Sequence, residues 1–86
     1  MKFELSKHAL DQMIRRDLSK EQVQLVIEQP DFIEIQDAGT KVYSKVFFEK
    51  SKAYLYRVFM NELKNPALII TVYKTSKTDK YVNKIR

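Results

Sequence analysis

The amino-acid sequence predicts an α+β domain in which two N-terminal helices pack on a four-stranded antiparallel sheet. Three observations predict this fold. Apolar residues recur with helical spacing before Pro30, the period then changes to segments rich in Phe, Tyr, Val and Ile, and short connections join those segments. Because a chain of 86 residues has room for one hydrophobic core, residues 1–86 are expected to form a single domain.

The first helix is predicted over residues 6–17. Leu10, Met13 and Ile14 recur at the i, i+3, i+4 spacing of one helical face, so we expect these side chains to face the core. At about 100° per residue, His8 lies about 160° around the helix from Leu10. The same calculation puts three further polar residues on the side away from this predicted core face: Gln12, Arg15 and Arg16.

A second helix follows almost at once and is predicted to begin after Ser19. Ser19 and Gln22 stand at the S-x-x-Q spacing of a capping box, in which each side chain bonds the backbone of the other residue. Pro30 ends the helix, because a residue that precedes proline is restricted to extended conformations. The apolar face of this helix consists of Val23, Val26 and Ile27.

Four strands are predicted after Pro30, over residues 32–37, 41–49, 53–61 and 67–75. Turn-forming residues separate them: Gly39, Lys50-Ser51-Lys52 and Asn65-Pro66. Since a parallel crossover needs about a dozen residues or more, strands with such short connections are expected to be antiparallel. Alternation along the strands leaves open which face the helices cover, because both faces are largely apolar. The polar strand residues expected at a site are Arg57, Thr71 and Tyr73.

Positive charge is concentrated near the C-terminus. The chain carries 16 basic and 11 acidic residues, a formal net charge of +5. Residues 74–86 hold five of these basic residues and one acidic residue, so this segment alone contributes +4. A basic segment of this kind suits an anionic partner, either a phosphate backbone or an acidic protein surface; the alternative is a solvated terminus without a partner.

Composition also limits the cellular setting and the chemistry. The chain has no cysteine, which excludes disulfides and thiolate metal sites and fits a reducing cytoplasm. Its longest apolar run, residues 67–70, is far shorter than the roughly 20 residues of a membrane span, and its N-terminus lacks the apolar core of a signal peptide. The sequence therefore predicts a cytoplasmic protein without a membrane partner, and no motif in it indicates a metal or cofactor.

His8 is the only histidine, and imidazole is the side chain that exchanges a proton most readily near neutral pH. Cleavage of RNA without a metal needs a base for the 2′-hydroxyl, an acid for the leaving 5′-oxygen and fixed positive charge for the transition state. His8, with Arg15 or Arg16 one or two turns later, has the side chains for proton exchange and phosphate contact. The alternatives are a solvated or helix-terminal histidine without a role and a histidine of the core.

Several stretches of the sequence resemble a known family of small prokaryotic domains of unknown function. Residues 8–19 are similar to its H-A-x-x-R-M-x-x-R-x-I-S signature, and residues 23–30 to its V-x-x-[VI]-[LI]-x-x-P helix end. Residues 70–73 are similar to its final strand, [IV]-[TV]-V-Y, and residues 75–81 to the T-S-K-x-x-K-Y of one branch. This family is similar to the BrnT and RelE toxins, in the broad group that includes barnase-like and colicin-type nucleases.

The resemblance implies a RelE- or BrnT-like toxin fold, metal-independent cleavage of RNA and a small cognate antitoxin protein. His8 stands at the signature histidine and Arg16 at the second signature arginine, whereas Gln12 replaces the first. Thr71 and Tyr73 match the final-strand motif. The basic tail of the one branch is matched by Lys74, Lys77 and Lys80.

Two hypotheses of different classes follow. The first is a toxin-type endoribonuclease without cofactors, with the catalytic residues His8, Arg16, Arg57 and Tyr73 and the RNA-binding residues Arg15, Thr71, Lys74, Lys77 and Lys80. The second is a non-catalytic module of the same fold that binds RNA or a protein through the same basic face. A third interpretation is an assembly protein that forms a homodimer through an exposed strand edge. The loss of the first signature arginine leaves the choice between enzyme and binding module open.

Overall fold

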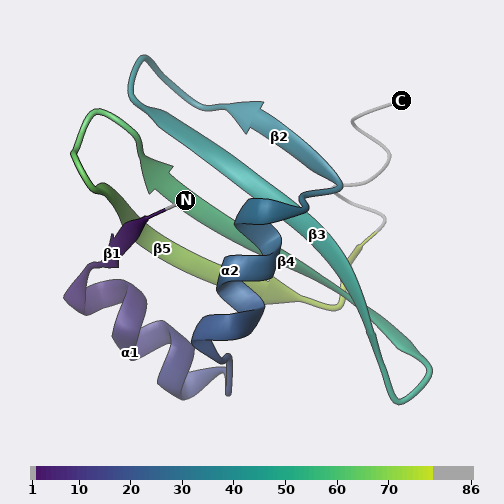
Figure 1. Cartoon of the computed structure of the whole chain (residues 1–86). Helices are drawn as coiled ribbons and strands as arrows, with labels where there is room; N and C mark the ends of the chain where they lie inside the picture. Colours follow the sequence, from purple (N-terminus) through teal and green to yellow (C-terminus); the bar gives the residue numbers. More distant parts are fainter. Residues whose placement is uncertain (1, 79–86) are drawn as a thin grey trace.

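The computed structural model describes residues 2–78 and shows two helices and five strands in this part of the chain (Figure 1). In chain order they are β1 (Phe3–Leu5), α1 (Lys7–Arg15), α2 (Lys20–Glu28), β2 (Phe32–Ile35), β3 (Thr40–Glu49), β4 (Lys52–Asn61) and β5 (Ala67–Thr75). Both predicted helices and all four predicted strands are confirmed, with small differences at their ends. Within the described residues, neither helix is long and apolar enough to cross a membrane.

The prediction of a four-stranded antiparallel sheet is wrong. The described residues form a five-stranded mixed sheet in the order β1-β5-β4-β3-β2, in which β1 pairs in parallel with β5. Phe3 lies opposite Ala67 and Leu5 opposite Ile69. A strand of three residues is too short to show alternation, and its partner lies near the other end of the chain. The long connection between the two, through both helices and the other strands, makes parallel pairing possible.

The predicted core face of α1 is also wrong in part. Ala9 is fully buried and Met13 is 7% exposed, as expected of a core face, but Leu10 is 45% and Ile14 79% exposed. The buried stripe of α1 is therefore centred between Ala9 and Met13, about 80° from the predicted position.

Ser6 explains how α1 is oriented. Its side chain caps the helix by accepting a hydrogen bond from the Ala9 N–H, and its hydroxyl donates to the carbonyl oxygen of Ile70. The backbone N–H of Ser6 donates to the carbonyl oxygen of Ile69. These bonds fix the start of α1 against β5. Ala9, three residues later, is then fully buried in the core.

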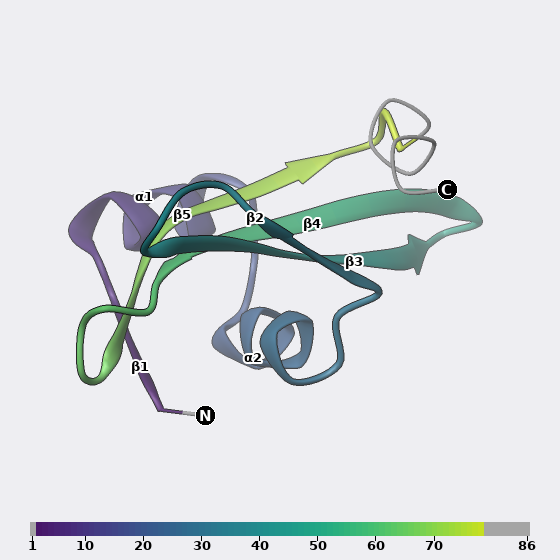
Figure 2. The same ribbon diagram turned by 90° about the horizontal axis from the view of Figure 1, so that it is seen from above.

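α2 covers one face of the sheet, whereas α1 runs along β5 (Figures 1 and 2). The predicted capping box is confirmed, because the Ser19 side chain accepts the Gln22 N–H and the Gln22 side chain accepts the Ser19 N–H. The buried residues of α2 are the three predicted ones, Val23, Val26 and Ile27. They share one core with the sheet residues Tyr43, Tyr56, Val58, Met60, Ile69 and Val72.

The sheet face opposite α2 is here called the outer face. Because Val58 and Val72 belong to the core under the helices, their strand neighbours project to the outer face. There Arg57 of β4 lies directly opposite Tyr73 of β5, and Phe59 lies opposite Thr71. The outer face is thus the side on which the predicted strand residues of the site gather.

Candidate functional site

His8 lies in a shallow hollow on the outward side of α1. The hollow has a volume of about 310 Å³ and is lined by His8, Asp11, Gln12, Arg15 and Arg16. His8, Gln12 and Arg16 follow one another at intervals of four residues, so they lie along the same side of the helix. The structure therefore brings together the histidine and the two arginines that the sequence indicates on this helix.

Arg16 joins the hollow to the outer face. Its Nη1 donates a 3.1 Å hydrogen bond to the carbonyl oxygen of Lys74, and its guanidinium carbon lies 5.1 Å from the centroid of the Tyr73 ring. Within residues 2–78, neither Arg15 nor Arg16 forms an ion pair with a carboxylate. The hollow thus holds two guanidinium groups and the Asp11 carboxylate, which leaves a net positive charge that an anion can neutralise. One of the two guanidinium groups is fixed in place.

Three side chains of the α1 region take the place of a neighbouring strand along β5. The Ser6 hydroxyl donates to the carbonyl oxygen of Ile70 at 2.9 Å, and the Gln12 Oε1 accepts the N–H of Val72 at 2.8 Å. Arg16 completes the series at the carbonyl oxygen of Lys74. The three bonded β5 residues are two positions apart, which is the spacing at which a strand bonds to one neighbouring strand. This arrangement extends the sheet edge beyond the short β1.

Gln12, which replaces a signature arginine, is therefore part of the sheet edge. Its amide oxygen accepts from Val72, whereas an arginine side chain has no acceptor and is unable to make this bond. We expect Gln12→Ala to destabilise the fold by about 1 to 3 kcal/mol, because the N–H of Val72 loses its partner. Gln12→Glu keeps an acceptor and should lose less stability. Urea unfolding at neutral pH checks both, and equal stabilities of wild type and Gln12→Ala would contradict this role.

Arg57 is engaged on the outer face. Its Nη2 lies 3.2 Å from Oε1 of Glu34, and its guanidinium carbon lies 5.2 Å from the centroid of the Phe59 ring. Its side chain is only 16% exposed. Tyr73, directly across from Arg57, is in contact with Arg16 on its other side. Arg16, Tyr73 and Arg57 thus form a row that connects α1 to the outer face. An anion that binds Arg57 has to compete with the Glu34 carboxylate.

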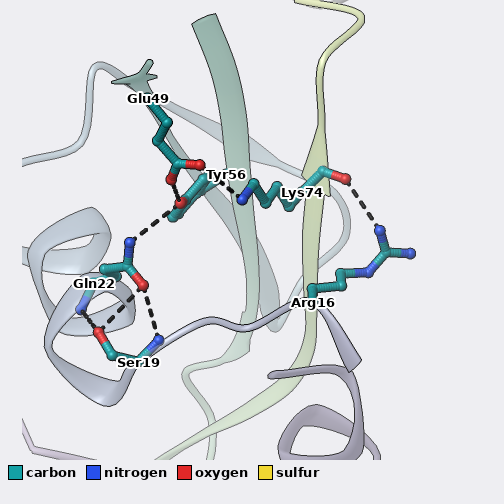
Figure 3. A network of polar contacts seen from close by, with 6 residues as sticks. All are labelled: Arg16, Ser19, Gln22, Glu49, Tyr56 and Lys74. Atoms are coloured by element: carbon teal, nitrogen blue, oxygen red, sulfur yellow. Dashed lines mark hydrogen bonds and ion pairs between the residues drawn. The ribbon is translucent and has the colours of Figure 1, made fainter. Parts of the chain in front are cut away.

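Lys74 projects to the face covered by α2, away from Thr71 and Tyr73. Its ammonium donates to Oε1 of Glu49 at 2.9 Å and lies 4.5 Å from the Tyr54 and 5.4 Å from the Tyr56 ring centroid. The Tyr56 hydroxyl donates to the same carboxylate and accepts a 3.2 Å bond from Gln22 of α2. Figure 3 shows both ends of this network: the Lys74 ammonium reaches Glu49 while its carbonyl holds Arg16. Lys74 thus contributes to the hollow through its backbone carbonyl, which fixes Arg16.

The remaining two predicted contacts lie beyond β5. Lys77 is exposed, and its backbone N–H donates to the Thr75 hydroxyl. Lys80 lies outside the described residues. The structure therefore brings His8, Arg15 and Arg16 together in the hollow and joins them to the outer-face residues Thr71, Tyr73 and Arg57, while Lys74 faces the other way.

The Glu49 carboxylate makes the fold sensitive to acid. The hydrogen bond from the Tyr56 hydroxyl, and then the bond from Lys74, lower the pKa of Glu49 below its ordinary value of 4.5. A carboxylate with a lowered pKa contributes stability above that ordinary value and loses it as the pH falls through the folded-state pKa. We therefore expect unfolding free energies of the wild type to fall between about pH 5 and pH 3 more steeply than those of Glu49→Gln. Parallel slopes in urea titrations at these pH values would show that Glu49 does not contribute.

A larger hollow lies elsewhere, between β1, α2 and the β4–β5 turn. It has a volume of about 730 Å³, and its lining residues include Lys2, Phe3, Lys20 and Pro66. It holds no imidazole, and its one carboxylate, on Glu62, already accepts from Tyr43 and pairs with Lys41. The smaller hollow on α1 is therefore the better candidate for chemistry, because it combines a group that exchanges protons with charge that has no ion-pair partner within residues 2–78.

Sequence reasoning missed the residues that hold this site in place. Ser6 directly precedes the first helical residues, and serine is a preferred N-cap residue. The sequence therefore held a signal for this residue. Gln12 and Glu34 carry no such local signal, because their partners Val72 and Arg57 come from strands that are distant in the sequence.

Residues 5–74 match a protein family described as a domain of unknown function, DUF4258. The match runs from the end of β1 to β5 and so includes the hollow and most of the outer face. No curated protein matches the chain, and no solved structure does.

Proposed function

Since the chain belongs to the DUF4258 family, a domain of unknown function, we propose its function from the site itself: a metal-independent endoribonuclease of the toxin type. One observation carries the proposal. His8, Arg15 and Arg16 line one hollow, and Arg16 is fixed by the Lys74 carbonyl and the Tyr73 ring. These are a proton-exchanging group and fixed positive charge, two of the three requirements for RNA cleavage without a metal; the third is an acid for the leaving 5′-oxygen.

In the proposed reaction the imidazole of His8 takes the proton of a ribose 2′-hydroxyl, and the 2′-oxygen attacks the adjacent phosphorus. The bond between phosphorus and the 5′-oxygen breaks, and that oxygen takes a proton from the Tyr73 hydroxyl. The products are a 2′,3′-cyclic phosphate and a 5′-hydroxyl. Arg16 donates hydrogen bonds to the non-bridging phosphate oxygens, whose negative charge grows in the transition state. Its contact with the Tyr73 ring keeps the phosphate contact beside the acid.

The other predicted residues bind the RNA chain on either side of the reacting phosphate. Arg15 contacts a neighbouring phosphate from the hollow, and Thr71 and Arg57 lie along the outer face next to Tyr73. The similarity of residues 8–19 to the signature described above extends the proposal to a relationship with BrnT and RelE toxins. Under that proposal the protein acts on cytoplasmic RNA, and a small antitoxin protein blocks the same basic surface.

A second candidate function is a module that binds RNA without cleaving it. The observation in its favour is Gln12, because a neutral side chain engaged with the Val72 N–H stands where the signature has a cation. The hollow then has two arginines for the phosphate instead of three. Binding to several phosphates requires positive charge but no proton transfer, so it tolerates this replacement better than catalysis does.

The experiment that tests both candidates compares two oligonucleotides of the same sequence, one RNA and one DNA, with purified full-length protein in the presence of EDTA. The proposed nuclease cleaves the RNA to a 2′,3′-cyclic phosphate and leaves the DNA intact, because DNA lacks the attacking 2′-hydroxyl. A binding module retains intact RNA with an affinity that falls steeply with salt. A protein that does not cleave the RNA and does not bind it in a salt-dependent way would overturn both candidates.

A further inference from the structure

α1 exposes two apolar side chains one turn apart. Leu10 is 45% and Ile14 79% exposed, and together they form an apolar patch on the side of the helix away from the hollow. Lys7 is exposed at the N-terminal end of this patch, and Asp17, just past the helix, is exposed at its C-terminal end. We call these four residues the α1 stripe.

The charges at the two ends of the α1 stripe have opposite signs. Within residues 2–78, neither Lys7 nor Asp17 forms an ion pair. A surface that is apolar in the middle and oppositely charged at its ends is complementary to a second copy of itself, related by a two-fold axis. In that arrangement Leu10 of one copy meets Ile14 of the other, and Lys7 meets Asp17.

We propose that the α1 stripe is a self-association surface through which two copies of this chain form an antiparallel helix pair. The central contact removes Leu10 and Ile14 of both copies from water. Each Lys7 gains the Asp17 of the other copy, and the antiparallel helix dipoles also favour this orientation over a parallel one. The hollow with His8 and Arg15 lies on the other flank of α1, so it stays open in the dimer.

A second exposed apolar patch fits a second copy less well. Ile33 is 50% and Ile35 77% exposed on the edge strand β2. Asp31 and Asp37 flank this patch in the sequence, so a two-fold pairing of β2 brings like charges together. The charge pattern therefore favours the α1 stripe over the β2 patch as the self-association surface, because the stripe has one basic and one acidic end.

The proposed interface is small. α1 has nine residues and is about 14 Å long, so two such helices bury less than the roughly 1,200 Å² of a stable standard interface. We expect a weak dimer with a dissociation constant on the order of 10 to 100 µM. Sedimentation equilibrium of the full chain, from about 5 to 500 µM, covers both sides of this range.

Ile14→Glu tests the apolar contact. It should raise the dissociation constant at least about tenfold, because the dimer then buries a carboxylate among apolar groups. Phe48→Glu is the matched control, since Phe48 is also 79% exposed but lies in β3, away from α1. This control should dimerise as the wild type does. Both residues are exposed, so both variants are expected to fold, and circular dichroism checks this.

A charge exchange tests the orientation. Lys7→Glu or Asp17→Lys alone should weaken the dimer by about two- to fivefold, and the two together should restore it. Asp17 has a φ of 54°, a conformation that Asp adopts more readily than Lys, so urea unfolding checks that Asp17→Lys keeps its stability. A wild type that stays monomeric at the highest concentration would overturn the proposal. So would a dimer that tolerates Ile14→Glu but is lost in Ile35→Glu, and so would a double variant no tighter than the single ones.

Discussion

His8→Ala is expected to lower the rate of RNA cleavage by about 10²- to 10⁴-fold, the usual contribution of a general acid or base. The His8 imidazole is the proton acceptor of the proposed reaction, and His8 is the only histidine of the chain. RNA affinity should change little, because Arg15 and Arg16 remain in the hollow. Single-turnover cleavage and fluorescence anisotropy, measured on the same RNA, separate these two effects.

The control for this variant is Lys7→Ala. Lys7 is on the same helix, is exposed and does not line the hollow. Its replacement should leave the cleavage rate unchanged. If His8→Ala instead weakens binding and leaves the cleavage rate of bound RNA intact, then His8 contacts the RNA and another group transfers the proton.

Arg16→Ala is expected to lower the rate of cleavage by about 10²- to 10³-fold, as the loss of a fixed donor to a developing negative charge does. Arg16→Lys should restore little of it. One ammonium has to replace a guanidinium that donates to the Lys74 carbonyl, lies against the Tyr73 ring and, in our proposal, also donates to phosphate. The ratio kcat/KM of the three proteins, measured with one RNA, checks this order.

Arg15→Ala provides the comparison for Arg16. Arg15 lines the same hollow, but within residues 2–78 it has no bond that fixes its guanidinium. Its loss should weaken RNA binding by a few-fold and reduce the salt dependence of the affinity by about one counterion. Wild-type activity in Arg16→Lys, or equal losses in Arg15→Ala and Arg16→Ala, would show that the anchoring of Arg16 is irrelevant to function.

The parts of the fold that were predictable from sequence are those with local signals. α2 has a capping box at Ser19 and a proline after its end, and its apolar face is the one observed. β2 to β5 are separated by short turns that allow only antiparallel pairing. These features depend on residues close in sequence, so the pattern alone identifies them.

The parts that were not predictable depend on contacts between distant segments. β1 has three residues, and its identity as a strand comes from pairing with β5. The rotation of α1 depends on bonds from Ser6 to Ile69 and Ile70, so the apolar spacing of Leu10 and Ile14 indicated a core face that the tertiary structure leaves exposed. A helical pattern shows that a face is apolar, but it does not show what covers that face.

The candidate site also has parts that were predictable from sequence and parts that were not. The helical positions of His8, Arg15 and Arg16 were calculable, and the hollow contains all three. Strand alternation puts Lys74 on the face opposite Thr71 and Tyr73, but which of the two faces α2 covers was not calculable. Nor was the bond from Gln12 to Val72, which turns an apparent loss of catalytic charge into a part of the sheet edge.

The central claim, that this chain cleaves RNA through His8, is tested most directly in a bacterial host. Wild type and His8→Ala are expressed from the same inducible promoter, and growth and the integrity of total RNA are followed in the same cultures. We expect arrested growth and fragmented RNA with the wild type and neither with His8→Ala, at equal protein levels. Normal growth and intact RNA with both proteins, or RNA fragmentation with both, would contradict the claim.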